Sequence, residues 1–469
     1  MKEIKKSILF IFWLLPITAL SSTIIRGVDK SYAGEEISFW TTVNPITGKE
    51  DLIARDTVNG DGSFLLEFDI HNTVKVQANL EVYKVYMFVE PEKEYDIILP
   101  PYKEKSKADE LNPYFNPIYI HLGTKLFTPD ELNVQIRMFH DAYNPYLNKH
   151  VDKILGDTDF EQLEKDIIKL DKPFAKTDNE FFNDYRKYKY GMLRILAMQN
   201  KSKSTSNKYF KDRPFLYDNP SYTDLFNMVY EGYFMHFSRA DKSGSLKDAI
   251  SNKKDFRAVY NALSKGELIQ PEELLTMVIL KCLYDEFYDD NYSRSAMLNI
   301  LSSFIETCTD KQQLKIAREI KEKVTKLLVG HTPPAFKLYD IDSNEVTLNS
   351  LKGKYVYLNF CTCYSYTCIK EFTMLQNLYE KHNQYLSIVT IAVDDDVETV
   401  RDFVTRSGYS WKFLHSGLQR GIIKDYDIRA FPTYYLIDRE GKLVMSPAAS
   451  PSEDFEGRLF KTLKAKGEL

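Results

Sequence analysis

The chain has 469 residues, more than one ordinary hydrophobic core accommodates, so we expect two or three domains. Aromatic residues make up 14% of it, with 32 tyrosines and 29 phenylalanines, which argues against a globally disordered protein. The net charge is −5, and nothing in it supports a nucleic-acid partner or a protein that binds anionic membrane surfaces.

Residues 1–21 have the pattern of a signal peptide. Three lysines in the first six residues give a basic start, and residues 8–20 form an apolar run that is short for a membrane span. Ala19 and Ser21 are small residues spaced like a cleavage pair. We therefore expect an exported protein of the periplasm or cell envelope, whose mature chain starts near Ser22 and has no transmembrane span. An uncleaved anchor is the alternative.

Residues 22–101 predict a small antiparallel β-sandwich. A strong turn signal at 59–62 (Asn-Gly-Asp-Gly) precedes an apolar strand pattern, and a longer β-rich run covers 74–89. Such runs pack as two layers around one core. We expect the next segment, 102–127, to be a linker.

Residues 128–328 predict an all-α middle domain. Thr128 suits a helix cap and Pro129 suits the first helical position. The histidines show no metal-ligand spacing, so we expect no metal and no cofactor. Cys282 and Cys308 fall on separate predicted helices, where they are either bonded to each other or buried as free thiols. Apolar spacing of i, i+3 and i+4 predicts helices over 181–198, 222–237, 271–287, 296–308 and 312–328.

The last segment, 329–469, contains the most informative stretch. The apolar run 355–360 predicts a buried strand, and a helical pattern follows from about Thr367. Cys368 therefore lies in the first turn of a helix, where backbone N–H groups and the helix dipole acidify a thiol. A second buried strand is expected at 387–393, and the carboxylates of Asp394–Asp396 are interpreted as a solvated turn and helix cap.

These residues carry a resemblance to a known family. The Lys-Gly-Lys step at 352–354, the strand, the turn with Cys368 and then Glu371 resemble the thioredoxin-fold module of TlpA-like envelope thiol–disulfide oxidoreductases. Members of that family carry Cys-x-x-Cys, whereas Ser365 stands here at the place of the attacking cysteine and Cys368 at that of the resolving one. The resemblance implies an α/β thioredoxin-like fold over 329–469, and it places Pro432 at the family's cis-proline, facing the active-site thiols.

The resemblance also implies candidate site residues and partners. It assigns catalytic roles to Cys368, Ser365, Pro432 and Glu371. The implied partners are protein thiols or disulfides, or an unidentified protein of the envelope. Whether the chain is an enzyme is left open, because the Ser-x-x-Cys motif departs from the family pattern.

Serine cannot replace the attacking cysteine, because its hydroxyl forms no disulfide and no accessible anion near neutral pH. Four interpretations follow. In the first, Cys368 acts alone through mixed disulfides. In the second, Cys368 forms a redox pair with Cys363 or, less plausibly, with Cys361. A third is a peroxiredoxin-like peroxidase, since peroxiredoxins carry Thr or Ser three residues before their reactive cysteine, although two of their other features are missing. The fourth is a thioredoxin fold that has lost catalysis and serves as a binding or scaffold protein. The chain has five cysteines, and an odd number leaves at least one thiol unpaired within it.

Overall fold

The computed structural model describes residues 22–468, except 107–108, 111, 113–114, 126, 157–158, 199–201, 266–270, 395 and 418–420. The expected signal peptide therefore lies outside the described residues. The chain forms two compact units, the first from Met1–Glu104 with Pro117–Val229 and the second from Lys105–Asn116 with Tyr230–Leu469. We expected three domains, β-rich, helical and thioredoxin-like. The two compact units divide the chain differently, because the helices of the expected middle domain are shared between them.

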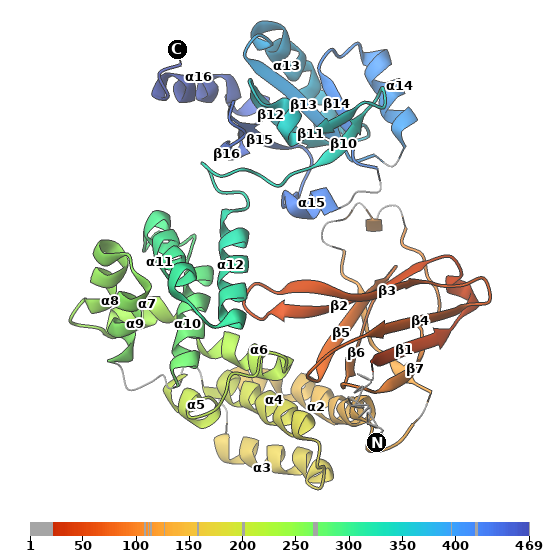
Figure 1. Ribbon diagram of the computed structural model, residues 1–469, viewed down its shortest axis with the longest axis vertical. Helices are drawn as coiled ribbons and strands as arrows, with labels where there is room; N and C mark the ends of the chain where they lie inside the picture. Colours follow the sequence, from red (N-terminus) through yellow and green to blue (C-terminus); the bar gives the residue numbers. More distant parts are fainter. Residues whose placement is uncertain are drawn as a thin grey trace, which may run out of the picture. The chain divides into compact units, whose positions relative to one another are not determined.

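Nine strands of the first unit form two sheets that share one hydrophobic core (Figure 1). The strands are β1 (Thr23–Val28), β2 (Glu36–Asn44), β3 (Lys49–Thr57), β4 (Ser63–Phe68), β5 (Val74–Leu80), β6 (Tyr83–Val89), β7 (Glu94–Ile98), β8 (Ile118–His121) and β9 (Gly123–Thr124). One sheet has the order β4-β1-β7-β9 and the other β3-β2-β5-β6-β8. Buried side chains of both sheets, such as Ile25 of β1 and Phe39 of β2, belong to the shared core.

Two expectations for this region need correction. The sheets are mixed rather than antiparallel, because β1 pairs with β7 and β6 pairs with β8 in parallel. Parallel neighbours require a long crossover, which a chain of simple hairpins does not provide. The segment 102–127 is more than a linker, since it supplies β8 and β9 to the two sheets.

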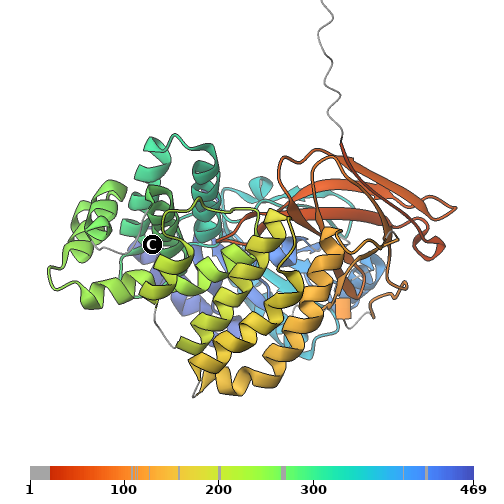
Figure 2. The same ribbon diagram turned by 90° about the horizontal axis from the view of Figure 1, so that it is seen from below.

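The described residues of the first unit also form helices, of which α4 contacts both α2 and α6 (Figure 2). They are α2 (Leu132–Leu155), α3 (Phe160–Asp171), α4 (Glu180–Met198), α5 (Ser202–Tyr209) and α6 (Pro220–Val229). The first of them begins at Leu132 and not at Thr128. The Glu131 carboxylate accepts hydrogen bonds from the backbone N–H groups of Asn133 (3.0 Å) and Val134 (2.9 Å), so Glu131 caps the helix in place of Thr128.

Among the described residues of the second unit, the helices that precede its sheet in the segment from Tyr230 onward are α7 (Tyr233–Ala240), α8 (Ser245–Asp248), α9 (Phe256–Ser264), α10 (Glu272–Asp285), α11 (Arg294–Thr307) and α12 (Lys311–Thr325). The helix expected over 222–237 is interrupted, because Gly232 has a φ of +59° between α6 and α7. Cys282 is buried in α10, whereas Cys308 is partly exposed, and both thiols are free. The disulfide alternative for this pair is therefore wrong.

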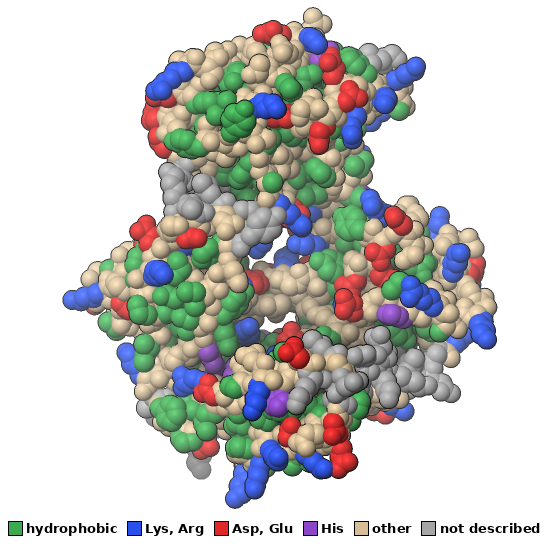
Figure 3. Space-filling model, turned by 180° about the vertical axis from the view of Figure 1, so that it is seen from behind, with side chains coloured by type: hydrophobic (Ala, Val, Ile, Leu, Met, Phe, Trp, Pro, Cys, Tyr) green, Lys and Arg blue, Asp and Glu red, His purple; other side chains and the backbone are tan. Residues whose placement is uncertain are grey.

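The charged side chains on the face drawn in Figure 3 are mixed in sign. Lysine and arginine side chains are interspersed there with aspartate and glutamate, and no large patch of one sign forms among the described residues of that face. No helix in the described part of the chain is both long and apolar enough to cross a bilayer.

The C-terminal part of the second unit is a seven-stranded sheet with helices on both faces. Its elements are β10 (Lys337–Asp340), β11 (Glu345–Thr347), β12 (Tyr355–Cys361), α13 (Tyr366–His382), β13 (Leu386–Ala392), α14 (Val397–Ser407), β14 (Lys412–His415), α15 (Gly421–Asp425), β15 (Thr433–Ile437), β16 (Leu443–Ala448) and α16 (Phe455–Ala465). The strand order is β11-β10-β14-β13-β12-β15-β16. The central strand, β12, runs parallel to β13 and antiparallel to β15.

All seven residues of β12 are buried, because both faces of the sheet are covered. Tyr355, Tyr357 and Cys361 belong to a core shared with α13, α14 and α16. Val356, Leu358 and Phe360 belong to a second core, on the face covered by α15. This alternation follows from the two-residue period of a strand, and it places Cys361 on the α13 side of the sheet.

Candidate functional site

The candidate site lies where β12 ends and α13 begins. Ser365 is the N-cap of α13, and its side-chain oxygen accepts a hydrogen bond of 3.4 Å from the backbone N–H of Cys368. The serine at the family's nucleophile position therefore holds the first turn of the helix. Cys368 lies in that turn and is fully buried.

Hydrogen bonding by three neighbouring groups lowers the pKa of Cys368. They are, in order of effect, the side chain of Cys361, the backbone N–H of Thr362 and the hydroxyl of Ser365. Burial and the charge of Asp394 act in the opposite direction. The balance leaves the pKa of Cys368 below the ordinary value of a thiol, as a position at a helix N-terminus favours.

The other two cysteines of the site have the opposite character. Burial raises the pKa of Cys361 well above its ordinary value, and the hydrogen bond that it gives to Cys368 adds to this effect. Burial and the nearby Asp394 carboxylate raise the pKa of Cys363. Cys361 contacts the sulfur of Cys368, whereas Cys363 hydrogen-bonds to Asp394.

Asp394 is a site residue that the sequence interpretation missed. It is buried, accepts hydrogen bonds from the hydroxyl of Thr362 (3.0 Å) and from the backbone N–H of Cys363 (3.0 and 3.1 Å), and is not part of a solvated turn. Asp396 does cap α14, and Asp395 lies outside the described residues. The sequence could have indicated this role of Asp394. Because β12 and β13 are parallel neighbours, residues that directly follow the two strands lie at the same edge of the sheet.

Glu371 lies one turn after Cys368 on α13 and is buried. Its carboxylate accepts a hydrogen bond of 2.6 Å from the hydroxyl of Ser452. Burial, followed by the charges of Cys361, Glu371 and Cys368, raises the pKa of Tyr434 on β15. Tyr434 and Glu371 therefore lie in the same buried region as the sulfurs of Cys361 and Cys368.

Pro432 precedes β15, and the Phe431–Pro432 peptide bond is cis. Thr433 pairs with Phe360 in the antiparallel ladder of β12 and β15, so the proline loop lies beside the end of β12 that carries Cys361. Of the sequence-predicted residues, Ser365 hydrogen-bonds to the backbone of Cys368, and Cys361 belongs to the same buried cluster as Cys368.

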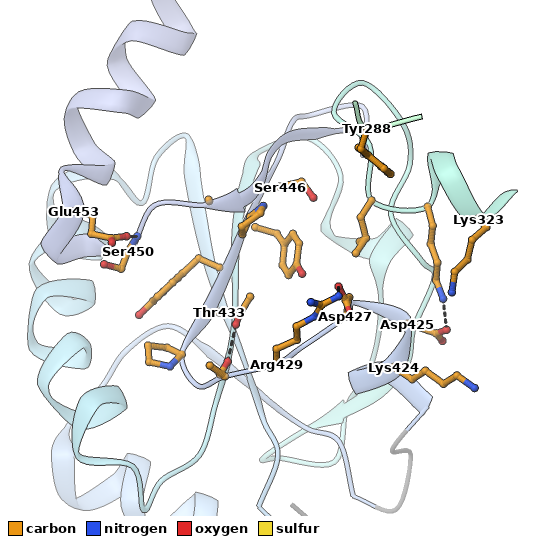
Figure 4. A pocket seen from close by; sticks show the side chains of 18 residues that line it. Tyr288, Lys323, Lys424, Asp425, Asp427, Arg429, Thr433, Ser446, Ser450 and Glu453 are labelled. Carbon is orange, nitrogen blue, oxygen red and sulfur yellow. Dashed lines mark hydrogen bonds and ion pairs between the residues drawn. The ribbon is translucent and has the colours of Figure 1, made fainter. Parts of the chain in front are cut away.

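A pocket of about 710 Å³ opens beside the Pro432 loop (Figure 4). Its walls come from α12, α15, β15, β16 and the loops next to them, and the ion pair of Lys326 with Asp425 (2.6 Å) lies on one side. None of the described cysteines lines this pocket. The two side chains that flank Ser365, Tyr364 and Tyr366, are instead exposed to solvent, at 71% and 81%. The described residues contain no group of three or more His, Cys, Asp or Glu side chains arranged to hold a metal ion.

A parallel β12–α13–β13 crossover with a cysteine in the first turn of its helix defines a thioredoxin-like module. The redoxin family profile matches residues 328–456. Residues of this part are 31% identical over 138 residues to the thiol-disulfide oxidoreductase ResA of Bacillus thuringiensis (strain Al Hakam), covering 29% of this chain and 79% of the relative. The identity to ResA of Bacillus subtilis (strain 168) is 34% over 117 residues, covering 24% of this chain and 64% of the relative.

Among solved structures, a thiol:disulfide interchange protein from Bacteroides sp. is 26% identical, with a TM-score of 0.27, covering 29% of this chain and 90% of that one. The chain belongs to the redoxin family through its C-terminal part, which is homologous to ResA.

Proposed function

We propose that this chain is a TlpA-like thioredoxin-fold protein of the cell envelope, which performs thiol-based redox chemistry through Cys368. Ser365 occupies the usual nucleophile position in a Ser-x-x-Cys motif and serves as cap and hydrogen-bond donor. Homology to thiol-disulfide oxidoreductases supports thiols or disulfides as the reaction partners. Glu371 and Pro432 flank the site in this proposal, one on α13 and the other beside the end of β12.

The observation that carries the proposal is the place of Cys368 in the first turn of α13, beside the N-cap Ser365, where the pKa of its thiol is lowered. A hydrogen bond to a charged group contributes about 1.5–3 kcal/mol, and the thiolate is the nucleophilic form of cysteine. The Thr362 N–H, the Ser365 hydroxyl and the Cys361 thiol all favour that form of Cys368. A cysteine kept only as packing material needs no such set of donors.

Alkylation tests this proposal with a control that the chain itself provides. Cys282 and Cys368 are equally buried, but burial raises the pKa of Cys282 whereas the donors lower that of Cys368. We expect iodoacetamide to modify Cys368 faster than Cys282 in the native protein near pH 7, as followed by mass spectrometry of time points. Equal rates for the two thiols would contradict the proposal. A Cys368→Ser variant verifies the assignment of the modified peptide.

A second function is favoured by one specific observation. Cys368 has no exposed surface, and the residue at the nucleophile position is a serine, so the module also fits a binding or scaffold protein without catalysis. In that case the exposed Tyr364 and Tyr366 are contacts for a partner. Unreactive Cys368, together with no gain of activity in Ser365→Cys, would support this function.

The envelope location rests on residues 1–21, which lie outside the described part of the chain. Their basic start, short apolar run and small residues at 19 and 21 support export. N-terminal sequencing of protein from the envelope fraction should give a mature start near Ser22. Recovery of the intact Met1 terminus in the cytosol would contradict this part of the proposal. We also propose that the thioredoxin-like part, 329–469, is a domain distinct from the β-rich 22–101 and helical 128–328 regions.

A further inference from the structure

We propose that the pocket beside the Pro432 loop binds an acidic peptide segment of another protein, with the acidic end of the segment against Lys323 and Lys424. None of the described cysteines lines this pocket, so the ligand needs no sulfur chemistry to bind. The proposal therefore goes beyond thiol-based redox chemistry. It adds a site that holds a partner protein and that depends on helices outside the thioredoxin-like part of the chain.

The two walls of the pocket are joined by specific bonds within the second unit. One wall is the end of α12 with the loop after α10, and the other consists of α15, β15 and β16. The ion pair of Lys326 with Asp425 (2.6 Å) links the end of α12 to α15. The backbone of Leu443 in β16 accepts a hydrogen bond from the N–H of Gly330 (2.8 Å) and donates one to the carbonyl of His331 (2.9 Å). These bonds hold the segment after α12 against the sheet, so the pocket is preformed in this structure.

Two ion pairs account for four of the charged side chains in the lining. Lys326 pairs with Asp425, and Arg429 pairs with Asp427 at 2.9 Å. All four residues belong to the lining, so neither pair adds a net charge to the pocket. The charged side chains that remain in the lining are Lys323, Lys424 and Glu453.

Lys323 and Lys424 give one side of the pocket an excess of positive charge. Both are exposed, and neither forms an ion pair with a carboxylate in the described part of the chain. Glu453 lies on the opposite side, where its carboxylate accepts a hydrogen bond of 3.0 Å from the backbone N–H of Ser450 (Figure 4). A ligand carboxylate is therefore attracted to the side of the two lysines and repelled from the side of Glu453. This difference sets the direction of the bound segment.

The rest of the lining favours a longer, uncharged stretch of ligand. Apolar surface comes from Ala430, Pro432, Pro447 and Ala448. A volume of about 710 Å³ lies in the range of pockets that hold a drug-sized ligand, which corresponds to a peptide of a few residues. A small anion would bind at the lysines and leave the apolar surface in contact with water. A segment with acidic residues at one end and uncharged residues after them covers both parts.

Tyr288 provides a fixed aromatic contact for such a segment. This residue of the lining is 53% exposed, although two interactions hold its side chain. Its hydroxyl donates to the carbonyl of Val324 in α12 (2.9 Å), and the guanidinium of Arg294 lies 5.0 Å from the ring centroid. A ring that is already held loses little conformational freedom when a ligand packs against it, which favours binding.

The test measures the binding of a hexapeptide to the full chain by fluorescence anisotropy. The peptide has two glutamates followed by four alternating valines and alanines, and it carries a neutral dye. We expect saturable binding that weakens as the salt concentration rises from about 0.01 M to 0.15 M, because the Debye length falls from about 30 Å to 8 Å. A matched peptide with two glutamines in place of the glutamates should bind about 2–30-fold more weakly, as the loss of two exposed ion pairs predicts. Equal binding of the two peptides would overturn the role of the acidic end.

Two double variants with the same loss of charge test the location of the site. Lys323→Gln with Lys424→Gln should weaken the binding of the acidic peptide about 2–30-fold and leave that of the glutamine peptide unchanged. Lys461→Gln with Lys464→Gln removes two exposed charges from α16, outside the lining, and should leave both affinities unchanged. All four lysines are exposed, so both variants should unfold at the wild-type denaturant midpoint. Equal affinities of the two double variants for the acidic peptide would overturn the location.

Two further measurements test the class of ligand. Tyr288→Ala should weaken the binding of both peptides, whereas Tyr339→Ala, at an exposed tyrosine of β10 outside the lining, should weaken neither. Unlabelled acidic peptide should displace the labelled one. Displacement by succinate or inorganic phosphate at the same concentration would overturn the peptide as ligand, in favour of a small anion. No thiol takes part in this binding, so a lack of binding leaves the proposed function standing. Equal alkylation of Cys368 and Cys282, in turn, contradicts that function and not this inference.

Discussion

Replacing Ser365 by alanine removes one oxygen atom that has two separate contacts. The oxygen accepts the backbone N–H of Cys368 at the start of α13, and its hydroxyl donates to the Cys368 sulfur. The first contact stabilises the helix and the second stabilises the thiolate. The two effects have different readouts, so one variant tests both.

The structure gives a magnitude for each effect. Loss of an N-cap side chain costs about 1 kcal/mol of unfolding free energy. Loss of a hydrogen bond to a charged group costs about 1.5–3 kcal/mol, so the pKa of Cys368 should rise towards its ordinary value. The thiolate fraction below the pKa then falls by about 10–100-fold, and the alkylation rate near pH 7 falls with it.

The assay is the pH dependence of Cys368 alkylation in the wild type, Ser365→Ala and Ser365→Thr. The threonine keeps a hydroxyl and should keep the wild-type profile. Thr347→Ala is a matched control, because its hydroxyl caps another short helix of the same module and accepts from the backbone N–H of Ser350 at 3.2 Å. It should lose stability without changing the profile of Cys368. An unchanged profile in Ser365→Ala, with a stability loss like that of Thr347→Ala, would refute the role of the serine as a donor to the thiolate.

Three further predictions concern the site and the two units. Ser365→Cys should raise insulin-type disulfide reduction above the wild-type level, because it puts a thiol at the N-terminus of α13 with Cys368 three residues on; an unchanged rate contradicts this. Burial lowers the pKa of His140 from 6.5 to about 4, so between these pH values the unfolded chain binds more protons than the folded chain. The first unit should therefore lose up to about 3 kcal/mol of stability as pH falls from about 6.5 to 4. Denaturant unfolding of His140→Gln should show a smaller loss, and an equal one would refute the assignment. Burial raises the pKa of Glu286 from 4.5 to about 7, so the folded form holds the proton and the second unit should lose up to about 3 kcal/mol as pH rises from about 4.5 to 7. Glu286→Gln should flatten that slope, and an unchanged slope would show that the group titrates normally.

The local interactions around Cys368 were predictable from sequence. An apolar run followed by a helical pattern predicted β12 and α13, with Cys368 in the first turn of the helix. These features depend on contacts between residues a few positions apart, which strand and helix periods determine. The same reasoning misplaced the start of α2, because Glu131 and Thr128 offered competing caps within one turn.

The tertiary structure decided which side chains surround the sulfur. The sheet order brings the end of β13, and with it Asp394, next to the end of β12, and Asp394 then binds the Cys363 backbone and attracts its thiol. Cys361 instead faces α13, because alternate residues of β12 point to opposite faces of the sheet. Cys363 is closer to Cys368 along the chain than Cys361 is. Strand pleating places Cys361 on the face of the sheet that α13 covers, where it lowers the pKa of Cys368, and this cannot be read from the distance along the chain.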